Sequence, residues 1–335
     1  MRRAGRLLLS AAIVVAGIAA CAPRLMAVGD PVYNARLDIV AASTTAIMAD
    51  GASLPMRVFL ADEPHAAVVA LHGFNDYSNA FSEPGPGPWL AERGIVVYAI
   101  DQRGFGRAPG RGLWAGDNRM AEDAASVVKL VRTRHPDLPV YLLGVSMGGA
   151  VAMRTMMLPE PPEIDGLILA APAVWGWRVM NDFYSVVLWA SAHIAPSYTL
   201  TGRGLEIMPS DNIEMLRALG RDPLVIKETR IDTIYGLVNL MDSAYAVAPD
   251  LGVPVLLLYG ANDRIVPAPP LADALAAMRS GAAPVTALCY PEGWHMLLRD
   301  LQREAVWRDI TAWISGDAIV SGHADLQPCG ALAGG

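Results

Sequence analysis

The chain has 335 residues, 53% hydrophobic and 18% charged, and a formal net charge of −7 at pH 7. This length and composition suit one large α/β domain or two smaller ones, and the acidic balance without a basic stripe excludes a nucleic-acid-binding surface. Three cysteines without a C-x-x-C pair, and no H-E-x-x-H sequence, argue against a zinc site. We therefore expect neither a metal nor an organic cofactor.

The first twenty residues have the pattern of a targeting signal. Three arginines precede an apolar run, residues 7–20, that is too short to span a bilayer comfortably. The small residues before Cys21 resemble a bacterial lipobox, in which the cysteine is lipidated and the chain is cut just before it. Ala22 resembles the residue found there in lipoproteins sorted to an outer membrane. An ordinary secretory signal and an uncleaved anchor are the alternatives.

These features predict a lipoprotein signal peptide over residues 1–20, followed by an anchor and linker over residues 21–36. A lipidated Cys21 would hold the protein on a membrane of the bacterial cell envelope, at the outer membrane or the periplasmic face. The domain that follows would then lie outside the cytoplasm.

Strand-like runs begin after the linker. Residues 37–42 and 54–60 are apolar or alternating, and the turn signal at residues 49–51 between them indicates a hairpin. Residues 66–71 are wholly apolar and suit a buried parallel strand. His72-Gly73-Phe74 follows that strand directly and resembles an oxyanion loop, in which the Phe74 backbone N–H would face the reacting oxygen. We interpret His72 itself as structural.

A second buried strand, residues 95–100, follows a short helix at residues 88–93. It ends at an Asp-x-x-Gly-x-Gly turn that starts at Asp101. The glycine spacing and Pro109 do not fit a dinucleotide-binding loop, so we interpret Asp101 as a residue that orders the turn. A helix is expected over residues 118–134.

The segment Gly144-Val145-Ser146-Met147-Gly148 has the spacing of a nucleophile elbow. An apolar strand-like run (140–143) precedes it, and a helix-prone run (150–157) follows. Such a serine sits on a sharp turn, where Cβ atoms two residues before and after it would clash. The Met147 backbone N–H, at the start of the helix, would face the developing oxyanion.

The alternation of strand and helix patterns stops after the next buried strand, residues 166–170. Residues 173–250 are rich in aromatic side chains and read as a helical lid inserted between two strands. Two of its helices are expected to begin near Ser210-Asp211 and at Asp222-Pro223.

The buried-strand pattern returns at residues 253–259 and 285–290, with helices over 271–278 and 303–314. Cys289 is expected to be a small buried hydrophobe, and a disulfide with Cys329 has no spacing argument for or against it. The tail, residues 316–335, is expected to be disordered.

Ser146, Asp263 and His295 each follow a predicted strand, in the chain order nucleophile, acid, histidine. In a doubly wound parallel sheet the carboxyl ends of the strands share one edge, so the three side chains can meet there. His295 would accept the Ser146 proton, and Asp263 would orient the imidazole. The alternative interpretations are that Asp263 caps a turn and that His295 is a surface histidine.

Residues 37–315 resemble the α/β-hydrolase family, and within it the monoacylglycerol lipase and lysophospholipase (serine aminopeptidase-like) group. The resemblance implies an α/β fold with a doubly wound, mostly parallel sheet and an inserted helical lid. It also implies hydrolysis of carboxylic esters through an acyl-enzyme, with a monoacylglycerol or lysophospholipid as the amphiphilic substrate. A peptidase or amidase of the same fold and a non-catalytic lipoprotein scaffold are the alternatives. Acyl-chain length, head group and oligomeric state stay open.

Overall fold

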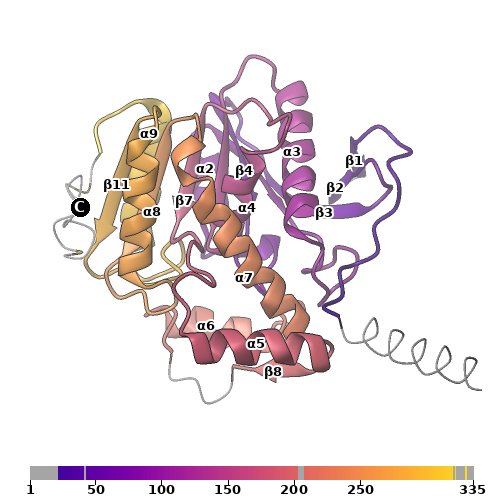
Figure 1. Cartoon of the computed structure of the whole chain (residues 1–335). Coiled ribbons are helices and arrows are strands. Elements are labelled where there is room, and N and C mark those ends of the chain that lie inside the picture. The colour runs from indigo at the N-terminus through magenta and orange to yellow at the C-terminus, as the bar shows by residue number, and fades with distance from the viewer. Residues whose placement is uncertain (1–21, 41–42, 203–206, 320, 322–328, 330–335) are drawn as a thin grey trace, which may run out of the picture.

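The computed structural model describes residues 22–40, 43–202, 207–319, 321 and 329 (Figure 1). The predicted signal peptide and Cys21 lie outside the described residues. Within the described part of the chain, no helix combines the length and the apolar character needed to cross a membrane.

One large sheet organises the described chain. Its six central and carboxyl-side strands run parallel, whereas the first three pair antiparallel. In spatial order the strands are β1 (Arg36–Val40), β2 (Ser43–Ile47), β3 (Ser53–Phe59), β5 (Ile95–Ile100), β4 (Ala66–Leu71), β6 (Val140–Val145), β7 (Gly166–Ala170), β10 (Val255–Gly260) and β11 (Val285–Tyr290).

Helices cover both faces of this sheet (Figure 1). The pleat of β4 explains why both faces are apolar: Val69 and Leu71 point into one core, and Val68 and Ala70 into the other. One core is closed by α3 (Asp117–Arg134), α4 (Met147–Thr155), α7 (Ile231–Ala246) and α8 (Ala268–Ser280), and the other by α2 (Pro86–Ala91) and α9 (Arg303–Ser315). This is the doubly wound, mostly parallel α/β arrangement predicted from the sequence. Two 3₁₀ turns, η1 (Ser78–Phe81) and η2 (Ala248–Asp250), complete the domain.

A long insertion, residues 173–250, lies between β7 and β10. Figure 1 shows its first elements at the edge of the sheet toward which β11 points. In chain order it contains α5 (Asp182–Ile194), β8 (Thr199–Thr201), α6 (Ile213–Arg221), β9 (Glu228–Arg230) and α7.

The predicted helix start at Asp222-Pro223 is wrong. Asp222 instead caps the end of α6, where its carboxylate accepts hydrogen bonds from the Leu224 N–H at 2.8 Å and the Tyr77 hydroxyl at 2.7 Å. The chain then runs extended through β9, which pairs with β8. The helix begins only at Ile231.

The predicted hairpin exists, but its first strand is β2 and not the run over residues 37–42. The turn at residues 49–51 joins β2 to β3, with Gly51 at φ 80° and the Asp50 carboxylate accepting the Ala52 N–H at 3.1 Å. β2 carries the polar sequence Ser-Thr-Thr-Ala-Ile, which gives little strand signal. β1 adds a further antiparallel strand beyond it.

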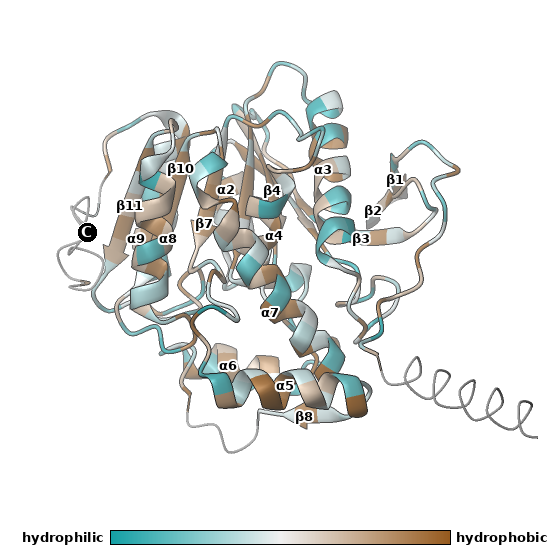
Figure 2. Ribbon diagram, viewed as in Figure 1, coloured by the Kyte–Doolittle hydropathy of each residue, from teal (hydrophilic) through white to brown (hydrophobic). Residues whose placement is uncertain are grey.

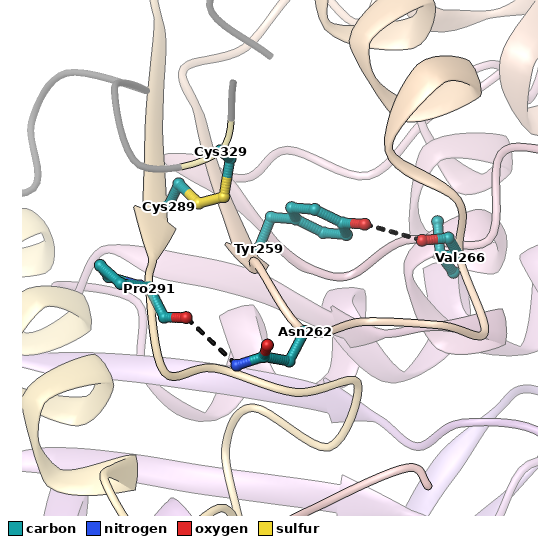
Figure 3. The surroundings of a disulfide bond; sticks show 6 residues. All are labelled: Tyr259, Asn262, Val266, Cys289, Pro291 and Cys329. Carbon is teal, nitrogen blue, oxygen red and sulfur yellow. Dashed lines mark hydrogen bonds between the residues drawn. A yellow bond between two sulfur atoms is a disulfide. The ribbon is translucent and has the colours of Figure 1, made fainter. Parts of the chain in front are cut away.

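Both ends of the described chain contact the domain. Near the start, Met26 is buried and its N–H donates to the Trp114 carbonyl at 2.8 Å. In the tail that was expected to be disordered, Cys329 is buried and forms a disulfide with Cys289 of β11, with their Cα atoms 6.0 Å apart (Figure 3). Cys289 is therefore buried, as predicted, but as half of a disulfide.

Candidate active site

Ser146 sits on a tight turn between β6 and α4. Its backbone has φ 52° and ψ −115°, a strained conformation for a residue with a side chain. A Cβ on Gly144 would overlap the Gly148 carbonyl, and a Cβ on Gly148 would overlap the Leu71 carbonyl. Both glycines are therefore required by close backbone approach, as the spacing predicted. The Ser146 N–H donates to the Ala170 carbonyl at 2.9 Å, which fixes the turn to β7.

Asp263 and His295 meet at the carboxyl ends of the neighbouring strands β10 and β11. The Nδ1 atom of His295 lies 2.8 Å from Oδ2 of Asp263, and both side chains are buried. Since an ionised carboxylate can only accept, Nδ1 carries the proton and Nε2 is left as the acceptor. The other oxygen of Asp263, Oδ1, accepts the N–H groups of Ile265 at 2.8 Å and Val266 at 3.0 Å.

Ser146 and His295 line one cavity of about 250 Å³. In the described chain the Ser146 hydroxyl makes no hydrogen bond to His295. Such catalytic contacts tighten when substrate binds. The walls are mostly apolar and come from the domain and from the insertion. They include Phe74, Phe81, Val145, Trp175, Leu237, Met241, Val266, Met296 and Leu298.

The two predicted oxyanion donors are the backbone N–H groups of Met147 and Phe74. Met147 is the first residue of α4 and follows Ser146 directly, while Phe74 lines the cavity. Neither backbone N–H donates to another protein group within the described chain. In the described chain these two N–H groups have no protein acceptor, and one follows the strained serine while the other belongs to a residue of the same cavity, so both are available to stabilise negative charge.

His72 and Asp101 hold the loops behind the site. The Gln102 N–H donates to Nε2 of His72 at 3.0 Å, so Nδ1 carries the proton and donates to the Gly73 carbonyl at 2.8 Å. Complete burial lowers the pKa of His72, which keeps the ring neutral. Asp101 accepts the N–H groups of Ser78 and Arg107, both at 2.9 Å. The structural interpretation of both residues is confirmed.

A buried ion pair in the cavity wall was not predicted from the sequence. Arg299 donates from Nη2 to Oδ2 of Asp76 at 2.5 Å, and both residues line the cavity. Asp76 lies two residues after the predicted oxyanion loop, which was a usable signal, but nothing local marks Arg299. The insertion supplies further apolar walls through Trp175, Leu237 and Met241. The aromatic composition of residues 173–250 was a signal for such a lining, but it did not single out these three residues.

A doubly wound sheet, a strained serine at its carboxyl edge and a histidine–aspartate pair beside it define an α/β-hydrolase. Residues 62–302 match the family described as serine aminopeptidase, S33, and the chain belongs to that family. The protein is thus a hydrolase.

Known relatives agree with this placement. The chain is 28% identical over 268 residues to a monoacylglycerol lipase of Mycolicibacterium smegmatis, with 75% of this chain and 89% of the relative covered. It is 26% identical over 272 residues to the monoglyceride lipase of Homo sapiens, with 78% and 86% covered.

A crystal structure of a soluble variant of monoglyceride lipase from Saccharomyces cerevisiae, in complex with a substrate analog, has the same fold. It superposes with a TM-score of 0.68 at 17% identity and covers 87% of this chain and 96% of the other.

Proposed function

We propose that Ser146, His295 and Asp263 form a catalytic triad that hydrolyses carboxylic esters through an acyl-enzyme. Oγ of Ser146 attacks the ester carbonyl carbon, and its proton passes to Nε2 of His295. The Phe74 and Met147 N–H groups hold the oxyanion while the alcohol leaves with the proton. A water molecule, deprotonated by the same imidazole, then releases the acid. The observation that carries this proposal is the Asp263–His295 hydrogen bond beside the strained serine in one apolar cavity.

The substrate is an amphiphilic lipid ester, a monoacylglycerol or a lysophospholipid. The apolar cavity suits an acyl chain, and the relatives that match are named for monoacylglycerol or monoglyceride hydrolysis. Because the insertion contributes Trp175, Leu237 and Met241 to the cavity wall, it serves as the lid of this site. The buried Asp76–Arg299 pair supplies a polar wall that can face the head group.

The enzyme works in the cell envelope, tethered through a lipidated Cys21. The Cys289–Cys329 disulfide supports an oxidising compartment, because disulfides are rare in the cytosol. Figure 2 shows hydrophobic (brown) segments along α5. Ala192 is buried in that helix, but six of its seven large apolar residues are exposed, which supports work at a lipid interface. Those exposed residues are Phe183, Tyr184, Val186, Val187, Trp189 and Ile194.

The substrate class is tested with a chain starting at residue 22, assayed on acyl-matched monoacylglycerols, lysophospholipids and aminoacyl amides. We expect ester turnover to exceed amide turnover. A preference for the amides would overturn the lipid assignment in favour of a peptidase. A protein that neither turns over any of these substrates nor reacts with a fluorophosphonate would be a scaffold.

The tether is tested separately in cells. Cys21→Ser should release the protein from the membrane fraction or leave it uncleaved. Unchanged membrane retention together with an unchanged mature mass would contradict lipidation at Cys21.

A further inference from the structure

Four consecutive residues of the insertion bind the loop that carries His295. We call residues 209–212, just before α6, the strap, and residues 294–301 the histidine loop. Each strap residue makes one hydrogen bond to the histidine loop. These bonds run from the Met296 N–H to the Pro209 carbonyl (2.9 Å), from the Ser210 hydroxyl to Asp300 Oδ1 (2.5 Å), from the Leu301 N–H to Asp211 Oδ1 (2.9 Å) and from Asn212 Nδ2 to the Arg299 carbonyl (2.9 Å).

Asp300 is the centre of this contact. Its side chain and that of Ser210 are both 0% exposed. One carboxylate oxygen accepts the Ser210 hydroxyl, and the other accepts the Trp294 N–H at 2.7 Å. Burial raises the pKa of Asp300 to about 6, although the bonds from Ser210 and Trp294 act to lower it. A buried carboxylate that lost the Ser210 hydroxyl would have to find another donor or rotate away from Trp294.

The backbone is held on both sides of His295. The residue before it, Trp294, is fixed by Asp300, and the residue after it, Met296, is fixed by Pro209 of the strap. Asp263 holds the imidazole through Nδ1. Asp263 therefore orients the imidazole ring. The strap, directly and through Asp300, fixes the position of the His295 backbone.

We propose that Ser210 and Asp300 are positioning residues. Through them, the position of the His295 imidazole depends on how the insertion packs against the histidine loop. The proposal rests on the triad put forward above. Since a displacement of about 1 Å in a catalytic group can cost about 10²-fold in rate, loss of one strap bond acts mainly on kcat. Neither residue lines the cavity, so substrate contacts change only through the histidine-loop residues that do line it, and the effect on KM is smaller than the effect on kcat.

The test compares Ser210→Ala with Thr233→Val. Thr233 is an equally buried hydroxyl of the insertion, and it donates to the Gly112 carbonyl at 2.9 Å, away from the histidine loop. We expect Ser210→Ala to lower kcat for a soluble short-chain ester about 10-fold with KM within about 2-fold. Thr233→Val should change kcat by less than about 2-fold at a comparable melting temperature. Equal effects of the two variants on kcat would overturn the proposal.

A readout that does not depend on turnover separates this proposal from the triad. The proton on Nδ1 of His295 should give a low-field proton NMR resonance, assigned by its loss in His295→Gln. We expect that resonance to shift or broaden in Ser210→Ala and to persist in Thr233→Val. An unshifted resonance in Ser210→Ala would overturn the coupling even if the enzyme is active. If the resonance shifts in Ser210→Ala but the wild type does not react with a fluorophosphonate, the triad is contradicted and the coupling stays intact.

The Asp300→Asn variant provides a second test of the proposal. Its amide can accept one of the two hydrogen bonds, so it should reproduce the kcat loss of Ser210→Ala, and the double variant should lose no more than the single variants. Strictly additive losses would show that the two residues act separately and would contradict the proposal. If Asp300→Asn does not fold, Ser210→Ala and its NMR readout decide the question alone.

Discussion

His295 donates from Nδ1 to Oδ2 of Asp263 over 2.8 Å, and Oδ1 of the same carboxylate is already occupied by two backbone N–H groups. The backbone bonds fix the carboxylate, so Oδ2 has one role, which is to select the tautomer of the imidazole. The pair follows two adjacent parallel strands, β10 and β11, and this explains how residues 32 positions apart come into contact.

Asp263→Asn should keep the fold and lose activity. The amide can keep an oxygen toward the Ile265 and Val266 N–H groups, but it then presents an NH₂ to His295 and favours the wrong tautomer. We expect kcat to fall about 10³- to 10⁴-fold with a small change in KM. Steady-state kinetics on a chromogenic ester measure this, with the exposed neighbour Arg264→Lys as control. A loss under about 10-fold would exclude Asp263 from the triad.

Gly148→Ala tests the strained turn. The added Cβ would overlap the Leu71 carbonyl, so the start of α4 must move away from β4 and carry Met147 with it. We expect a loss of activity of at least about 10²-fold and a lower melting temperature. Gly220→Ala is the matched control, because nothing lies within 4 Å of its Cβ position in α6. The control should be neutral or stabilising by up to about 1 kcal/mol, and an equally benign Gly148→Ala would contradict the close approach.

Because of Asp300, the free energy of unfolding should fall as pH rises from about 4 to about 6. Its folded pKa of about 6 lies above the value of about 3.9 expected in the unfolded chain, so the folded state binds more protons in this window. The full effect is about 3 kcal/mol, since each pKa unit is worth about 1.4 kcal/mol.

Replacing the carboxyl removes this dependence. Relative to wild type, Asp300→Asn should therefore be more stable at pH 7.5 than at pH 4, as measured by urea unfolding at both pH values. The exposed Asp137→Asn provides the baseline, and a pH slope identical to wild type in Asp300→Asn would show that Asp300 does not carry the effect.

The disulfide should stabilise the domain by closing a loop of 40 residues. Cys329→Ser removes it, and we expect the free energy of unfolding to fall by about 2–4 kcal/mol. Activity of the folded variant should persist, since neither cysteine lines the cavity. Urea unfolding of the variant and of reduced wild type should give the same loss. A variant as stable as oxidised wild type would mean that the tail contributes nothing through this bond.

Those parts of the candidate site that depend on short sequence patterns could be predicted from the sequence. The elbow follows from glycine spacing, because backbone contacts within a few residues exclude a Cβ at Gly144 and Gly148. The order of Ser146, Asp263 and His295 sufficed to place them at one sheet edge, since each lies within five residues after the carboxyl end of a strand.

Contacts between distant segments could not be predicted. Ser210 and Asp300 lie 90 residues apart and Asp76 and Arg299 lie 223 apart, and neither pair has a local pattern. The helix start at Asp222 failed for a related reason. An Asp-Pro pair also suits a turn, and the Tyr77 hydroxyl that binds Asp222 comes from 145 residues away.

Removal of one oxygen atom tests the proposed chemistry most directly. The Ser146→Ala variant keeps the turn and the Asp263–His295 pair but has no nucleophile, so we expect ester hydrolysis to fall at least about 10⁴-fold. We expect intact mass spectrometry of quenched wild type to show an acyl adduct, and this adduct should be absent from the variant. A variant that still hydrolyses the ester at a rate near that of wild type, or that still carries the adduct, would contradict the account.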